Sequence, residues 1–228
     1  ALGLEGGTVF QKLWATVKKF SSWMGITASV SRVTMKIRQA VTEIKELDNI
    51  LTEISKTSDR TIQSLEKLGN SAFDTASKYG RTASDYLTGV QEMSRAGFNE
   101  QGSEQMAELS ILAQSAGDMD TELANAYLIA TNAAYKLNGS AEKLNDVLDR
   151  QNYVTNRNAV NLTELANATK IAGSQASTSS VGVDEMTAAV GTMIATTQEG
   201  GEVAGRAFKA IIMNLQQVSA DADEIGDG

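Results

Sequence analysis

The heptad pattern of residues 30–54, VSRVTMKIRQAVTEIKELDNILTEI, sets the expected fold class of this chain. Apolar residues recur at alternating intervals of three and four, so every a and d position of four heptads is apolar. Strict 3.5-residue spacing predicts a left-handed coiled coil, and about 1.5 Å per residue makes a rod of roughly 40 Å. The predicted oligomer seam consists of Val30, Val33, Ile37, Ala40, Ile44, Leu47, Leu51 and Ile54.

The residue types at the a and d positions indicate which kind of partner helix packs on the seam. β-Branched residues at both a and d favour more than two strands, so self-association as a trimer is favoured, with a hexamer as a second option. Val41 and Ile50 lie at flanking positions and widen the apolar face. A broad face also suits an antiparallel partner helix within the same chain. The sequence leaves both arrangements open.

The preceding segment, residues 9–24, is amphipathic at helical spacing, with Lys12 and Lys19 on the opposite face. Such a face can lie on a membrane or in a partner groove. It can equally be an ordinary helix packed on its neighbours. The face contains both tryptophans of the chain and comprises Phe10, Leu13, Trp14, Val17, Phe20, Trp23 and Met24.

Residues 61–215 are predicted to form short helices separated by glycines and capping residues. The chain contains no proline, which fits an almost wholly helical protein. Helix ends are expected at Gly80, Gly97, Gly117 and Gly173, and helix starts at Ser84 or Asp85, Ser103, Asp120, Ser140, and Asn161 or Thr163. A polar stretch, 174–180, is expected to separate the helix ending at Gly173 from a helix over 184–197.

The predicted architecture is therefore all-α, in three parts. Residues 1–60 form the amphipathic helix and the heptad rod, residues 61–215 a multi-helix bundle of short Gly-capped helices, and residues 216–228 an acidic tail. A faint internal similarity links residues 76–80 with residues 168–173, each followed by a polar turn, an Asp (Asp85 or Asp184) and a helix. Shared capping chemistry explains that similarity as well as a repeat does.

The absence of histidine and cysteine excludes most site chemistry. Imidazole bases, thiol nucleophiles, thiolate metal sites and disulfides are all ruled out. Residues 221–228 begin like a calcium loop, but Ile225 occupies a ligand position and no closing Glu follows. We therefore expect no catalytic residues, no cofactor and no metal site. A cell-wall glycan hydrolase lacks a supporting carboxylate pair.

The net charge of −8 is unevenly spread along the chain. Residues 1–60 carry nine Lys/Arg and six Asp/Glu, a net +3, and the remainder carries a net −11. An acidic globular part argues against sequence-specific nucleic-acid binding. No stretch reaches the roughly 18 apolar residues of a membrane span, and no signal peptide is present. The chain starts at Ala1 without Met, so it is expected to be a piece of a longer protein.

Several helical blocks, taken in order, resemble the core region of phage tail tape measure proteins from siphophages and related prophages. These blocks are 47–55 (LDNILTEIS), 106–113 (MAELSILA) followed by Ala116-Gly117 and Asp120, 162–169 (LTELANAT), 182–190 (GVDEMTAAV) and 205–215 (GRAFKAIIMNL). No single block is diagnostic. Their order over about 180 residues carries the resemblance, and it brings no catalytic residues.

The resemblance implies a structural protein of the virion tail, made in the host cytoplasm. Such a protein lies in the tail tube lumen or tip, helps to set tail length, contacts tail tube and tail tip or baseplate proteins, and leaves ahead of the DNA on infection. Two alternatives stay open: a membrane-active segment aiding genome entry, with transient membrane contact, and a generic helical oligomerisation or adaptor domain.

Overall fold

The computed structural model describes the backbone of residues 30–226 and the side chains of residues 42–221. In this part of the chain nine helices are present and no strand, so the all-α prediction is confirmed. The helices are α2 (Val30–Thr57), α3 (Ile62–Ser77), α4 (Ala83–Arg95), α5 (Glu100–Gly117), α6 (Thr121–Ala134), α7 (Ala141–Thr155), α8 (Leu162–Thr178), α9 (Val183–Thr197) and α10 (Gly201–Gly226).

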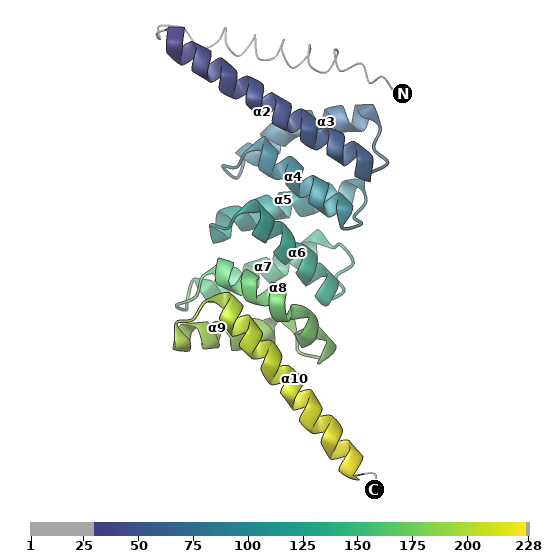
Figure 1. Ribbon diagram of the computed structural model, residues 1–228, viewed down its shortest axis with the longest axis vertical. Helices are drawn as coiled ribbons and strands as arrows, with labels where there is room; N and C mark the ends of the chain where they lie inside the picture. The colour runs from purple at the N-terminus through teal and green to yellow at the C-terminus, as the bar shows by residue number, and fades with distance from the viewer. Residues whose placement is uncertain (1–29, 227–228) are drawn as a thin grey trace.

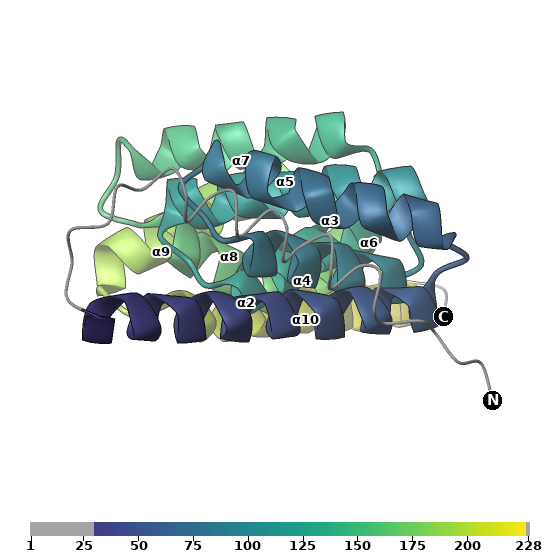
Figure 2. The ribbon, with the colours of Figure 1, turned by 90° about the horizontal axis from the view of Figure 1, so that it is seen from above.

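The helices stack in two layers along one axis, as in an α-solenoid (Figure 1). In one layer α2, α4, α6, α8 and α10 each pack on the next, and in the other α3, α5, α7 and α9 do the same. Figure 2 looks down the stack and shows α2 and α10 along one edge and α7 at the opposite edge. The core is correspondingly continuous along the axis, in three successive apolar clusters.

The capping residues reveal a structural repeat of about forty residues. Helices of the first layer are capped by Thr82, Asp120 and Asn161, and helices of the second layer by Asn99, Ser140 and Gly182. The hexapeptide Thr-Glu-Leu-Ala-Asn-Ala occurs at 121–126 and again at 163–168, at the start of α6 and of α8. The repeat unit is thus one helical hairpin.

The internal similarity noted between residues 76–80 and 168–173 does not mark this repeat. The first segment lies at the end of α3 in one layer, and the second lies inside α8 in the other. The two segments are alike in composition only, since Gly80 follows α3 in a turn with φ of +68° whereas Gly173 lies inside α8.

Local capping signals predicted several helix ends correctly. Asp120, Ser140 and Asn161 each accept a backbone N–H at the start of a helix. Gly80 and Gly97 follow α3 and α4 with φ of +68° and +93°, a conformation that costs glycine little. At α4 the cap is Thr82, two or three residues earlier than the expected Ser84 or Asp85, and the Asp85 carboxylate accepts the Thr82 N–H to complete a capping box.

Two helix boundaries were predicted wrongly. Ser103 does not open a helix: Asn99 caps α5, and Ser103 is buried one turn inside it. Gly173 does not end a helix, since α8 continues to Thr178 through most of the polar stretch. A Cβ at Gly173 would lie 3.7 Å from the Ala134 Cβ, an ordinary contact distance, so α8 passes close to α6 here without requiring a glycine.

Buried polar side chains connect neighbouring helices, both within a hairpin and between hairpins. The Tyr127 hydroxyl of α6 donates to Gln151 Oε1 of α7 at 2.7 Å, and Gln151 Nε2 donates to Thr187 Oγ1 of α9 at 2.9 Å. Between α5 and α6, the Ser110 hydroxyl donates to Asn125 Oδ1. All five of these residues are almost fully buried. Because buried polar groups require hydrogen-bond partners, these bonds restrict how neighbouring helices pack on one another.

Candidate functional site

Half of the predicted seam is packed inside the chain. Leu47 and Ile54 are buried in a cluster with residues of α3 and α4, while Ile44 and Leu51 are half-buried. A Cβ at Gly69 of α3 would lie 3.1 Å from a Leu51 methyl carbon, so α3 also approaches this face closely. The side chains of Val30, Val33, Ile37 and Ala40 lie outside the described residues.

The boundary placed near residue 60 is bridged by a buried cation. The Arg60 side chain, 1% exposed, lies 2.7 Å from a carboxylate oxygen of Glu104 and donates to the Glu100 carbonyl at 2.7 Å. It also donates to the Ser103 hydroxyl at 3.3 Å. The α2–α3 connection is therefore held on α5, and α2 shares one packed body with the helices that follow it.

The amphipathic face predicted from Phe10 to Met24 lies outside the described residues. Within the described part, none of the helices is both long and apolar enough to cross a membrane.

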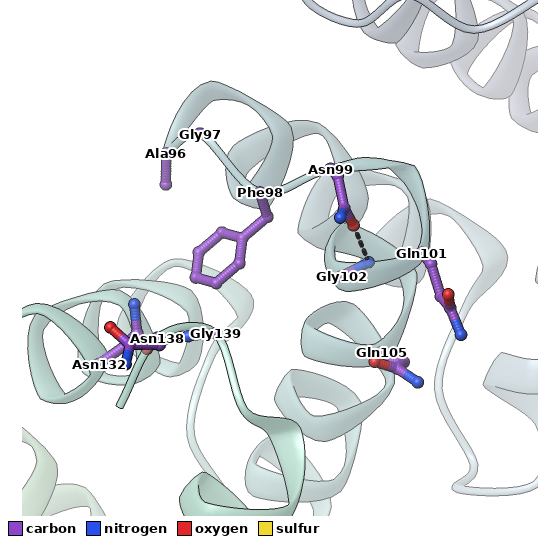
Figure 3. A pocket seen from close by; sticks show the side chains of 10 residues that line it. All are labelled: Ala96, Gly97, Phe98, Asn99, Gln101, Gly102, Gln105, Asn132, Asn138 and Gly139. Atoms are coloured by element: carbon purple, nitrogen blue, oxygen red, sulfur yellow. Dashed lines mark hydrogen bonds between the residues drawn. The ribbon is translucent and has the colours of Figure 1, made fainter. Parts of the chain in front are cut away.

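A polar cavity of about 480 Å³ lies beside the α4–α5 loop (Figure 3). Its lining includes Phe98 and five amide side chains, and contains no ionisable group. Two of the amides support local turns: Asn99 Oδ1 accepts the Gly102 N–H at 2.8 Å, and Asn132 Oδ1 accepts the Gly139 N–H at 2.8 Å. The cavity therefore lacks an acid or base and its amides stabilise the hairpin joints.

A second cavity, of about 520 Å³, lies between α7 and α9. Arg150 Nε lies 2.8 Å from Asp184 Oδ1 there, and both side chains are at least half exposed. The Arg157 guanidinium stacks over the Tyr153 ring at 3.7 Å. Exposed ion pairs and cation–π contacts of this kind are ordinary surface interactions and contribute little to stability.

The titratable groups with shifted pKa values do not form a reaction centre. Burial, helped by the nearby Glu104 carboxylate, raises the pKa of the Tyr86 hydroxyl, and burial also raises the pKa of Tyr127. Burial raises the pKa of Tyr135 to about 12. These phenols stay neutral near pH 7, as structural tyrosines do. Among the described residues no group of three carboxylates could hold a metal ion.

The feature best suited to a partner is α10, which leaves the stack partway along its length (Figure 1). Gly201 and Gly205 lie against the backbone at Glu164 and Ala168 of α8, so the two helices run parallel in close contact. The last side-chain bond between them joins Gln175 to Gln216 at 2.8 Å. Every residue from Met213 to Asp221 is exposed, and the acidic tail predicted for 216–228 is helical as far as Gly226.

A heptad stripe runs through α10 and was missed by the sequence analysis. Its apolar residues recur at alternating intervals of four and three, and the signal was present in the sequence. Exposure rises along the stripe from 3% at Ala204 and 9% at Phe208 to 49% at Ile211, 64% at Leu215 and 65% at Val218. The full stripe is Ala204, Phe208, Ile211, Leu215, Val218, Ala222 and Ile225.

One comparison with known proteins matches the stacked region. A family model described as "Phage-related minor tail protein" matches residues 69–227, well over half of the chain. The match begins inside α3 and covers every later helix of the stack. No solved structure matches the chain.

Proposed function

The chain belongs to the family of phage-related minor tail proteins, and from that premise we propose that it is a section of a tape measure protein. The protein has a structural role in the virion tail, in contact with other tail components. The finer proposal is that it lies in the tail tube lumen or tip, takes part in setting tail length, and leaves ahead of the DNA.

The observation that carries this proposal is the stack itself. A two-layer helical stack has a fixed length per hairpin and is rigid along its axis, because each hairpin packs on the next and buried hydrogen bonds join α5 to α6 and α7 to α9. The cavity beside the α4–α5 loop has no ionisable side chain in its lining, and the charged residues of the cavity between α7 and α9, Asp149, Arg150 and Asp184, are exposed. No group of three carboxylates in the described residues could hold a metal ion, so a scaffold role accounts for these features better than catalysis does. The ordered blocks that resemble tape measure proteins point the same way.

Within such a protein this section is an anchor rather than the ruler. A ruler gains length in proportion to residue number, at about 1.5 Å per residue in a continuous helix. Here the chain folds back at every hairpin, so most of its residues add width and not length. The long end helices α2 and α10 join the anchor to whatever lies on either side of it.

In-frame removal of residues 62–226 from the encoding phage gene tests this role. An anchor is needed to start the tail, so we expect lysates with heads and few or no tails in negative-stain electron micrographs. Supplying the intact gene from a plasmid is the control and should restore tails.

Two other outcomes would contradict the proposal. Tails of normal length and number would show that the section is not needed for tail assembly. Tails formed normally but shortened by roughly 250 Å, the length of 165 helical residues, would make this section the ruler and not the anchor.

A further inference from the structure

The two end helices carry complementary charge on their outer halves. Residues 216–226 of α10 contain Asp221, Asp223 and Glu224 and no Lys or Arg, a net −3. Residues 30–42 of α2 contain Arg32, Lys36 and Arg38 and no Asp or Glu, a net +3. We call these two segments the acidic end and the basic end.

Both ends also carry half of a heptad stripe. On α10 the stripe is buried against α8 at Ala204 and Phe208 and becomes exposed from Ile211 onward, as far as Val218, the last stripe residue whose side chain is described. On α2 the order is reversed: Leu47 and Ile54, in the second half, are buried against the stack, and the basic end precedes them. On α10 the stripe therefore extends beyond the part that its own stack covers, and on α2 the sequence extends the heptad pattern into the basic end.

The positions of the stacks determine the orientation in which these ends can pair. The stack lies on the N-terminal side of the acidic end and on the C-terminal side of the basic end (Figure 1). Parallel pairing therefore leaves the two stacks at opposite ends of the joint. Antiparallel pairing would bring both stacks to the same end, where they would compete for space.

We propose that the acidic end of α10 binds the basic end of α2 in a second copy of this chain, as a parallel heptad joint. Leu215 and Val218 pack against the a and d residues of the second copy's α2, and the opposite net charges favour this pairing over pairing of like ends. The interface is heterologous, so a joined pair keeps one free acidic end and one free basic end, and further copies can add head to tail.

Pairing of two acidic ends in parallel is disfavoured by the same charges. Asp221, Asp223 and Glu224 would then lie beside their own counterparts, and like charges in register repel. A symmetric dimer through α10 is thus the arrangement that the test must distinguish from the head-to-tail joint.

The test is sedimentation velocity of the whole chain with two single variants. Leu215→Asp places a carboxylate in the exposed stripe of α10, and Val33→Asp does the same at a seam position of α2. Each should weaken self-association by at least roughly 100-fold in Kd, because burying an unpaired carboxylate is costly. A 1:1 mixture of the two variants should form a dimer and nothing larger, since each supplies the end that the other lacks.

Met213→Asp is the matched control. Met213 is 51% exposed on the same helix but lies two residues from both Ile211 and Leu215, on the far side of α10 from the stripe. This variant should associate as the wild type does. Far-UV circular dichroism should show wild-type helicity for all three variants. Association of the wild type should weaken as salt is raised, because opposite charges meet.

The remaining outcomes overturn the joint. A wild type that stays monomeric at about 100 μM would contradict the proposed joint, because this concentration is well above the Kd expected of it. A symmetric α10 dimer would give a different result. Val33→Asp would then associate as strongly as the wild type, and mixing it with Leu215→Asp would produce no species larger than Val33→Asp forms alone. Loss of association in Met213→Asp would show that the binding face is not the heptad stripe.

Discussion

Replacing Gly205 by leucine is expected to lower the free energy of unfolding by about 3 kcal/mol and to loosen α10 from the stack. A Cβ at this position would lie 2.9 Å from the Ala168 Cα and 3.1 Å from its carbonyl oxygen. Both atoms belong to the backbone of α8, so they cannot move aside as a side chain end can. A leucine therefore forces the two helices apart.

The separation would expose the core at this end of the stack. Ala204, Phe208 and Ile212 of α10 are buried against α8 and α9 and would become solvated. Chemical denaturation followed by circular dichroism measures the loss. Gly200→Ser is the control, because nothing lies within 4 Å of a Cβ there and serine caps a helix start well. Equal stability of Gly205→Leu and wild type would show that α8 and α10 are not in backbone contact.

The second large effect is expected at the buried amide of Gln151. Replacing Gln151 by leucine should cost about 2 kcal/mol of stability, because the hydroxyl of Tyr127 loses its acceptor in a site without water access. Gln151 is 1% exposed and Tyr127 fully buried, with 2.7 Å between the hydroxyl and Oε1. Thr187 keeps its own bond to the Val183 carbonyl at 2.7 Å, so the loss falls on Tyr127.

A double mutant separates this mechanism from simple loss of packing. Adding Tyr127→Phe to Gln151→Leu removes the stranded hydroxyl, and at least half of the lost stability should return. Gln101→Leu, at an exposed position of α5, is the matched control and should stay within about 0.5 kcal/mol of wild type. If the two losses simply add in the double mutant, the hydrogen bond between the two side chains does not hold α6 on α7.

Local chemistry explains which parts of the fold could be predicted from the sequence. Asp120, Ser140 and Asn161 cap helices through bonds to residues three positions away, so a short window contains the whole signal. In the structure α8 continues through Gly173 and passes close to Ala134 of α6, some forty residues earlier, and a local sequence pattern does not report such a contact. The stacking order of the hairpins is likewise a property of contacts between distant residues.

The hairpin repeat and the heptad stripe of α10 were both present in the sequence, but neither was recognised from it. The hexapeptide shared by residues 121–126 and 163–168 marks the hairpin period directly. In α10, glycines at 200, 201 and 205 gave the appearance of a short, interrupted helix. In the structure those at 201 and 205 allow close contact with α8, and the helix is long because its stripe continues beyond the stack.

The seam shows how one apolar stripe can serve two surfaces. Its spacing predicted a coiled coil, and nothing in the residues distinguished a partner in the same chain from a second copy. In the structure Leu47 and Ile54 are buried in the stack. In the joint proposed above, the first half of the stripe binds a second copy. The α10 stripe is divided in the same manner: Ala204 and Phe208 are buried in the stack, and Leu215 and Val218 are exposed and take part in the proposed joint.

Quantitative mass spectrometry of purified phage tails, before and after DNA release, tests the central claim most directly. The account predicts peptides from residues 62–226 in intact particles, at a fixed ratio to the tube protein, and their loss from particles that have ejected DNA. Absence of these peptides from intact particles, or their full retention after ejection, would contradict it.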